Sequence, residues 1–133
     1  MKGLGSNVTK GLQVGSVIPV CDNSGAKKLK IISVIGSKTR KSRVPSAGVG
    51  DLVMGSVKKG KPDMKKQVVY AVIVRQKKEY RRFDGLRVKF EDNSAVILRD
   101  EQGNPKGTMM KGPIAKEAAE RWSAVSKIAS III

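Results

Sequence analysis

The chain has 133 residues and a mass of 14.4 kDa, and its 27 Lys and Arg against 11 Asp and Glu give a formal charge of +16. This length excludes a large multidomain enzyme, and a hydrophobic content of 40% excludes wholesale disorder. No apolar run approaches the ~18–20 residues of a membrane span, and the first residues carry no signal-peptide pattern, so we expect one small cytoplasmic domain without a membrane partner.

Short β-segments separated by turn residues fill most of the chain. Residues 14–21 have β character and are followed by Asp22-Asn23-Ser24-Gly25, a cluster typical of turns. The unbroken apolar run at 68–74 predicts a strand that is buried on both faces. Further strands are predicted at 29–35, 51–57, 86–90 and 95–98, with an exposed loop at 36–48. This series of short strands favours a small closed barrel.

The spacing of the apolar residues changes near the C-terminus. Gly112-Pro113 offers a helix start, and Glu117 and Glu120 lie early, where the helix dipole favours acids. Apolar side chains then recur at three- and four-residue spacing, namely Ile114, Ala118, Trp122, Val125 and Ala129. The pattern predicts an amphipathic helix over 113–122, followed by a further turn or short helix up to 129, which caps the open end of the barrel.

The positive charge is concentrated in the first part of the chain. Residues 1–82 hold 19 basic and 4 acidic side chains, whereas residues 83–133 hold 8 and 7. Four segments contain 17 of the 27 cations: 27–30, 38–43, 58–66 and 75–82. One such run is often only a solvated surface, but four of them store self-repulsion that a polyanion would relieve. Nucleic acid is the leading partner, because each neutralised phosphate releases condensed counterions.

Residues that support catalysis or metal binding are scarce. The chain has no histidine, so Cys21 has no partner for a nucleophilic dyad, and we interpret it as a small buried apolar residue. Residues 55–62 approach the phosphate-binding loop, but Pro62 stands where that motif needs a hydroxyl for Mg²⁺. The acidic pairs at 91–92 and 100–101 lie at predicted turns and are interpreted as solvated carboxylates. We therefore predict no enzymatic activity, metal or cofactor.

The few aromatic residues indicate the kind of nucleic acid. Proteins that bind single strands stack bases on exposed rings. Tyr70, Phe90 and Trp122 fall in apolar patterns typical of a core, which leaves Tyr80 and Phe83 as stacking candidates. Recognition of folded RNA through its phosphates and shape fits this inventory better than base-by-base reading.

Several blocks of the sequence resemble a known family. Ala71-Val72-Ile73-Val74, Asp84-Gly85, Phe90, Asn93 and Val96-Ile97, at their spacing, resemble the signature of the large-subunit ribosomal protein L-fourteen family. Further similar blocks lie at 22–26, 47–51, 57–60, 75–78, 80–82 and 112–113, so the resemblance covers residues 14–133. The stretch 90–93 and the ending 117–133 are more similar to the archaeal and eukaryotic branch, and the archaeal form is favoured.

The resemblance implies a mainly β fold, a five-stranded β-barrel with a protruding β-ribbon and a short C-terminal helical region. On this chain it implies one domain, with an extended leader at 1–13, the barrel at 14–111 and the helical region at 112–133. The implied function is a structural constituent of the large ribosomal subunit that binds large-subunit rRNA and joins an inter-subunit bridge with small-subunit rRNA. The implied neighbours are a ribosomal protein of the L-twenty-four-e type and assembly or anti-association factors at the C-terminal region.

The basic segments and the helix supply the expected contact residues. The expected RNA contacts are Lys27, Lys28, Lys38, Arg40, Lys41, Arg43, Lys58, Lys59, Lys61, Lys65, Lys66, Arg75, Lys77, Lys78, Arg81 and Arg82. The expected protein-facing or bridge-facing surface is Lys116, Glu120 and Arg121. Two alternatives remain open at this point: a free-standing single-strand-binding barrel, which needs exposed rings, and a small phosphotransfer enzyme, which needs a completed phosphate loop.

Overall fold

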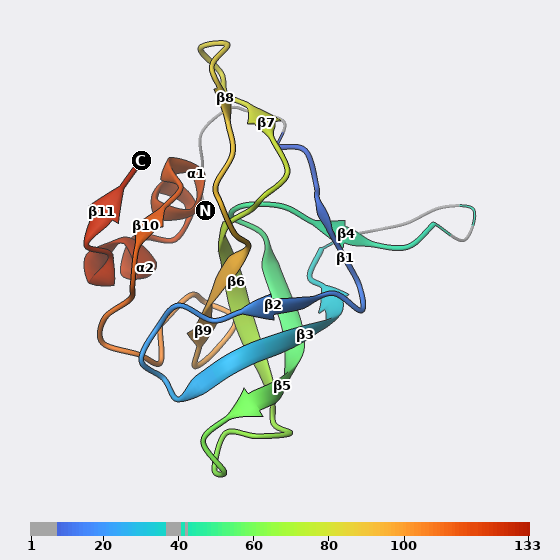
Figure 1. Cartoon of the computed structure of the whole chain (residues 1–133), viewed down its shortest axis with the longest axis vertical. Helices are drawn as coiled ribbons and strands as arrows, with labels where there is room; N and C mark the ends of the chain where they lie inside the picture. The colour runs from blue at the N-terminus through green and yellow to red at the C-terminus, as the bar shows by residue number, and fades with distance from the viewer. Residues whose placement is uncertain (1–7, 37–40, 42) are drawn as a thin grey trace.

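The centre of the molecule is a curled five-stranded sheet (Figure 1). The computed structural model describes residues 8–36, 41 and 43–133. The sheet has the order β2-β3-β5-β6-β9, and each neighbouring pair is antiparallel. Its strands are β2 (Val17–Pro19), β3 (Ala26–Val34), β5 (Leu52–Gly60), β6 (Val68–Arg75) and β9 (Ser94–Leu98). The mainly β class predicted from the sequence is confirmed.

The two edge strands of this sheet approach each other. Val20, just after β2, forms an isolated parallel bridge with Ala95 of β9, and the Cys21 amide donates to the Ala95 carbonyl at 3.1 Å. The Asp22 carboxylate then accepts the Ile97 amide at 3.0 Å. These contacts bring the sheet towards a barrel, but the seam between β2 and β9 is a single bridge with local hydrogen bonds and not a continuous ladder.

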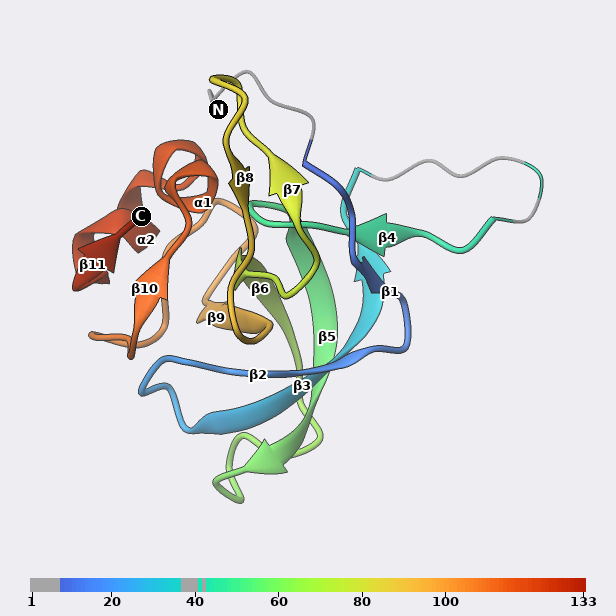
Figure 2. The same cartoon turned by 45° about the horizontal axis from the view of Figure 1, so that its top comes forward.

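Three two-stranded pairs extend from the central sheet. β1 (Leu12–Gln13) pairs with β4 (Ser46–Ala47), and β7 (Tyr80–Arg81) pairs with β8 (Arg87–Val88). β10 (Pro113–Ile114) and β11 (Ile131–Ile132) run parallel beside the helices α1 (Lys116–Arg121) and α2 (Ser123–Ile128). Figure 1 and the turned view in Figure 2 place the β7–β8 ribbon and the β5–β6 turn at opposite ends of the molecule.

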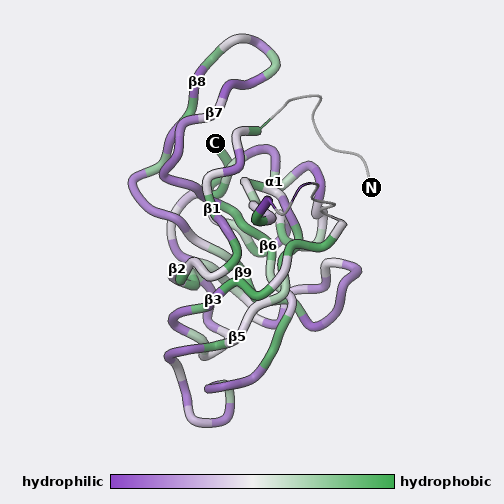
Figure 3. The backbone as a smooth tube through the Cα atoms, turned by 90° about the vertical axis from the view of Figure 1, so that its right-hand side faces the viewer, coloured by the Kyte–Doolittle hydropathy of each residue, from purple (hydrophilic) through white to green (hydrophobic). Residues whose placement is uncertain are grey.

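Strand β6 is covered on both faces, as its unbroken apolar run predicts. Ala71 and Ile73 point into a cluster inside the curled sheet, while Val72 and Val74 point into a second cluster on the outside. Strand β9 alternates in the same way, with Ile97 inside and Val96 outside. Both strands are drawn in hydrophobic colours in Figure 3, in contrast to the largely hydrophilic ribbon and loops. Double burial of two adjacent strands requires a second layer of protein.

The C-terminal helices supply that layer. Ala118, Trp122 and Val125 are buried in the outer cluster, and the Trp122 indole donates to the Gly50 carbonyl at 2.7 Å. The predicted apolar stripe is therefore confirmed, but the helices cover the outer face of β6 and β9 and not an open end of the barrel. No helix in the described part of the chain is long and apolar enough to cross a membrane.

The boundaries of several elements differ from the sequence prediction. Strand β3 begins at Ala26 and not at 29, and β8 is shorter than the predicted 86–90. The end of the predicted exposed loop at 36–48 forms β4, where Ala47 is buried and pairs with β1. The predicted helix start at 112–113 is wrong, because Pro113 and Ile114 form β10 and the Ala115 amide donates to the Val74 carbonyl at 2.9 Å. Helix α1 then ends at Arg121, and a separate α2 begins at Ser123. Strand β5 continues to Gly60, beyond its predicted end at 57, because its last residues pair with β3.

A small polar cluster joins the ribbon to α1. The Tyr80 hydroxyl donates to Glu117 Oε2 at 2.8 Å, and Arg82 Nε donates to Glu117 Oε1 at 2.8 Å. Arg82 also donates to the Ile133 carbonyl at 2.6 Å. Glu117 and Tyr80 are both buried. The hydrogen bonds from Tyr80 and Arg82 therefore replace the water that the Glu117 carboxylate loses on burial.

Replacing Glu117 by Gln should lower the free energy of unfolding by about 1–3 kcal/mol, because the variant weakens a charged hydrogen bond in a buried site. The matched control is Glu120→Gln on the same helix, where the side chain is exposed and the change should stay within about 0.5 kcal/mol. Urea unfolding of both variants measures the difference. Equal stability of the two variants would contradict the role of Glu117.

Replacing Gly103 by Ala should destabilise the fold through contact with Trp122. Gly103 has φ +100°, and an added Cβ would lie 2.5 Å from the Trp122 ring. Gly85 has φ +91° with no atom within 4 Å of such a Cβ, so Gly85→Ala carries only the backbone cost of about 1–2 kcal/mol. At Gly103, overpacking against Trp122 should lower the free energy of unfolding by about 1–3 kcal/mol beyond this backbone cost. Thermal unfolding of the two variants tests this difference, and equal losses would refute it.

Candidate nucleic-acid interface

Lysines from β3 and β5 meet at one end of the sheet. Lys28 and Lys59 are register partners on adjacent strands, and both side chains are exposed. Lys27 and Lys58 are exposed beside them, because the β3–β5 ladder has register shifts on either side of Lys28. Like charges directly opposite each other destabilise a sheet unless a counter-charge is near. A bound anion would therefore reduce the repulsion between the ammonium groups of Lys28 and Lys59.

The β5–β6 turn adds three more lysines to the same end. Met64 is buried in the inner cluster and anchors the turn, while Lys61, Lys65 and Lys66 around it stay exposed. The Lys61 amide donates to the Gly25 carbonyl at 2.9 Å, which ties the turn to the start of β3. We name the following set the basic end: Lys27, Lys28, Lys58, Lys59, Lys61, Lys65 and Lys66.

The ion pairs of the described residues are made by arginine and not by lysine. The four salt bridges join Arg75 to Asp92, Arg82 to Glu117, Arg87 to Glu79 and Arg121 to Asp51. Within the range that the structure describes, no lysine of the basic end has a carboxylate partner within 4.0 Å. The lysine charges thus remain free to bind an external anion.

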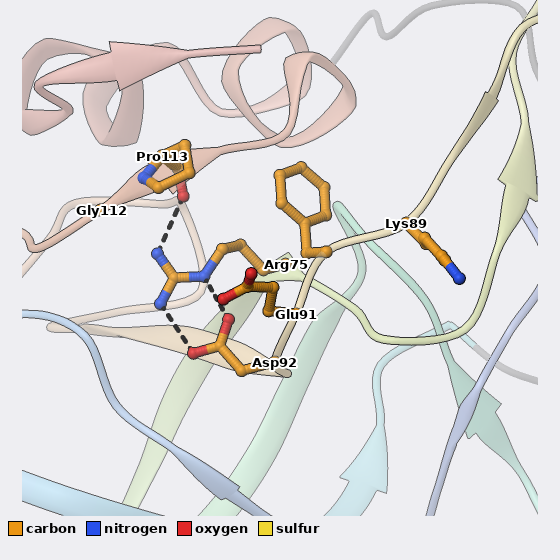
Figure 4. Close-up of a pocket in the computed structure, with 7 residues that line it drawn as sticks. Arg75, Lys89, Glu91, Asp92, Gly112 and Pro113 are labelled. Atoms are coloured by element: carbon orange, nitrogen blue, oxygen red, sulfur yellow. Dashed lines mark hydrogen bonds and ion pairs between the residues drawn. The ribbon is translucent and has the colours of Figure 1, made fainter.

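Arg75 takes a different place from the one expected from the sequence. Its guanidinium is buried and donates to both Asp92 carboxylate oxygens, at 3.0 and 3.2 Å. It also donates to the Pro113 carbonyl at 2.9 Å (Figure 4). A further hydrogen bond runs to the Lys111 carbonyl at 3.0 Å. Because its donors are engaged inside the protein, Arg75 acts as a structural clamp between β6 and β10, and its guanidinium is not available as an RNA contact. Asp92 likewise is part of this clamp and not a free turn carboxylate.

The ribbon keeps only part of its expected contact surface. Lys77, Lys78 and Arg81 are exposed, whereas the Arg82 side chain is 15% exposed and bound to Glu117. The expectation that Tyr80 stacks on bases is wrong, because its ring is fully buried. Burial and the neighbouring Glu117 also raise the pKa of the Tyr80 hydroxyl, which keeps it protonated as a donor. Phe83, at the ribbon tip, is 86% exposed.

The remaining expected residues lie on two other surfaces. Lys41 and Arg43 are exposed in the loop before β4, while Lys38 and Arg40 fall outside the described residues. Lys116 and Glu120 are exposed on α1. Arg121 is also exposed in part, but it pairs with Asp51 at 3.3 Å and lies over the Trp122 ring.

The described residues do not form a metal site, a reactive cysteine site or a phosphate-binding loop. The described residues contain no group of three or more His, Cys, Asp or Glu that could hold a metal ion. Cys21 is buried, and this burial raises the pKa of its thiol, so the side chain stays neutral. The region resembling a phosphate-binding loop lies in strand β5 and the following turn, not in the strand-to-helix connection that a phosphate loop needs.

The sequence patterns missed two cations near the basic end. Arg99 and Lys106 are exposed, and Lys106 Nζ lies 3.1 Å from the Met64 sulfur in the β5–β6 turn. They belong to the nearly neutral second half of the chain and to no basic run. The pairing of β9 with β6, together with the Leu98–Pro105 bridge, brings them to this end of the molecule.

Comparisons with known proteins agree with the family blocks in the sequence. The family model of ribosomal protein L14p/L23e matches residues 11–133. "Large ribosomal subunit protein uL14" of Methanococcus vannielii is 57% identical over 132 residues, which is 99% of each chain. The protein of the same name from Nanoarchaeum equitans is 54% identical over 133 residues, covering both chains fully. The chain therefore belongs to the ribosomal protein L14p/L23e family in its archaeal form and is a non-enzymatic constituent of the large, cytoplasmic ribosomal subunit.

Proposed function

We propose that the protein binds large-subunit rRNA through its basic end and uses the ribbon and the loop before β4 as further contacts. The observation that carries this proposal is the exposed Lys28–Lys59 register pair within seven lysines that have no carboxylate partner in the described residues. An RNA phosphate between two such lysines would replace their repulsion with two attractive contacts. The fold itself holds the lysine-bearing backbone in fixed positions.

The basic segments point in different directions, which suits a protein that joins separate RNA segments. The β5–β6 turn and the ribbon lie at opposite ends, and residues 43–45, which precede β4, lie on a third side (Figure 1). Phosphates of neighbouring RNA helices repel each other at close range. A rigid body with cations on several sides can hold such helices together, because each helix meets its own set of lysines and arginines.

The C-terminal surface is the proposed site for the remaining partners. Exposed Lys116 and Glu120 on α1 lie in the same region as β11, where the isoleucines at 131–133 are about half exposed. Polar side chains beside exposed apolar ones are typical of a protein interface. We assign the neighbour of the L-twenty-four-e type and an assembly or anti-association factor to this region. The bridge with small-subunit rRNA is proposed for the adjoining exposed cations, including Arg121.

Reversing two charges of the basic end should weaken rRNA binding in a salt-dependent way. In Lys58→Glu/Lys59→Glu, the loss of two phosphate contacts should make the slope of log K against log salt less steep by about 1.5. The control Lys111→Glu/Lys127→Glu makes the same charge change at exposed lysines outside the basic end and should keep most of the affinity. Titration of folded large-subunit rRNA and an unrelated RNA across a salt series measures both. Equal loss in the two variants would contradict a localised site.

The two neighbouring arginines of the ribbon should behave differently. Arg81→Glu should fold normally but reduce incorporation into large subunits, because Arg81 is exposed and outside any salt bridge of the described residues. Arg82→Glu should instead lower thermal stability, since it places a second carboxylate beside buried Glu117. Reconstitution of subunits and thermal unfolding distinguish the two effects. Normal incorporation of folded Arg81→Glu would remove the ribbon from the proposed contacts.

A further inference from the structure

A groove of about 600 Å³ lies between the start of β6 and the end of β9. Its lining includes Val68 and Tyr70 of β6, Leu98 of β9, and Arg99 and Lys106 from the loop that follows. None of these residues belongs to the four basic runs of the sequence. The groove thus combines one aromatic ring, aliphatic side chains and two cations in one place.

The apolar part of the groove lies on the outer face of the sheet, at the margin of the helical layer. Tyr70 and Leu98 are register partners, and Tyr70 is packed against the outer cluster, is partly exposed as a residue and lines the groove. Two residues earlier on the same face, Val68 is 57% exposed. An aromatic ring beside an exposed aliphatic side chain forms a platform on which a flat group can stack.

The two cations are held by the backbone of the loop. The Arg99 amide donates to the Asn104 carbonyl at 2.8 Å, and the Lys106 amide donates to the Ile97 carbonyl at 3.0 Å. Neither side chain has a salt bridge to any residue that the structure describes. Asp100 lies next to Arg99, but its carboxylate accepts from the Asn104 side chain and the Gln102 amide. The loop therefore offers two cations that have no salt bridge among the described residues, and the nearby Asp100 carboxylate is already engaged within the loop.

The groove is continuous with the basic end. Lys65 and Lys66 immediately precede Gln67, which lines the groove. Lys106 reaches from the groove to Met64 of the β5–β6 turn. A polyanion that follows the lysines of the basic end would therefore arrive at the groove. This charge favours a nucleotide over an apolar peptide as the occupant.

We propose that the groove binds a single unpaired nucleotide of the RNA, with its base stacked on Tyr70 and its phosphate held by Arg99 and Lys106. This inference rests on the proposed RNA binding and adds a base-binding subsite to it. Stacking tolerates any base, because every base offers a flat face. The subsite thus favours a bulged or looped nucleotide over a paired one, without selecting its sequence.

The test uses the full chain labelled with ¹⁵N and two probes, a six-nucleotide oligoadenylate and tripolyphosphate. The oligonucleotide should shift the amide resonances of Tyr70 and Arg99, whereas tripolyphosphate, which lacks a base, should shift Arg99 and Lys106 but leave Tyr70 in place. Tyr70→Leu should weaken oligoadenylate binding at least about fivefold, and Tyr70→Phe should retain it because the ring remains. The amide spectrum of each variant checks that it is folded.

Equal oligoadenylate affinity of folded Tyr70→Leu and the wild-type chain would overturn the stacking site, as would identical shifts with both probes. If Tyr70→Leu does not fold, the comparison of the two probes on the wild-type chain decides the matter. Failure of the subsite is distinct from failure of RNA binding itself. If only the subsite fails, the Lys58→Glu/Lys59→Glu variant still loses rRNA affinity. If RNA binding by the basic end fails, that variant keeps the affinity of the wild-type chain.

Discussion

The burial of β6 and β9 on both faces is the constraint on which the rest of the structure depends. A small antiparallel sheet normally keeps one face in water. Here Val72, Val74 and Val96 carry apolar side chains to the outer face as well, so that face must be covered. The C-terminal segment supplies the cover, and Trp122 fixes it through its bond to the Gly50 carbonyl. Where the cover ends, at Tyr70 and Val68, the outer face becomes exposed, and the groove lies at that margin.

The shielded arginines and the lysines of the basic end have separate roles in this protein. Arg75 and Arg82 use their planar guanidinium groups to bind a carboxylate and backbone carbonyls at once, in sites that are mostly shielded from water. A guanidinium is weakly hydrated and presents several donors in fixed directions, so it suits such sites. An ammonium group is strongly hydrated and flexible, which suits an exposed surface that meets phosphates from many directions. The basic end is built of lysine alone.

The sequence predicts the elements well and the roles of single cations less well. The apolar run at 68–74 identifies β6 and its double burial, because a continuous apolar strand has no water-facing side. Residues 75–82 form one basic run in the sequence, but their environments in the fold differ. Arg75 is buried, Arg82 is largely buried and paired with Glu117, and Lys77 is exposed. The carboxylate partners of Arg75 and Arg82 are Asp92 and Glu117, which lie 17 and 35 residues further along the chain. A local sequence pattern cannot predict contacts at such separations. The same holds for Arg99 and Lys106, which only strand pairing brings to the basic end.

The Lys28–Lys59 pair links the stability of the protein to its proposed ligand. In the free protein, the two ammonium groups on adjacent strands oppose the pairing of β3 with β5, although hydration and dissolved salt reduce their repulsion. The strands nevertheless pair over most of their length, because Leu29, Ile31 and Val57 are buried beneath them in the inner cluster. The apolar face thus holds the lysines in a crowded arrangement that they would not adopt by themselves. An anion bound there relieves the repulsion and stabilises the folded sheet at the same time. The arrangement that suits a phosphate is thus present in the free protein, so binding of the proposed RNA ligand would not have to order the backbone that carries the lysines.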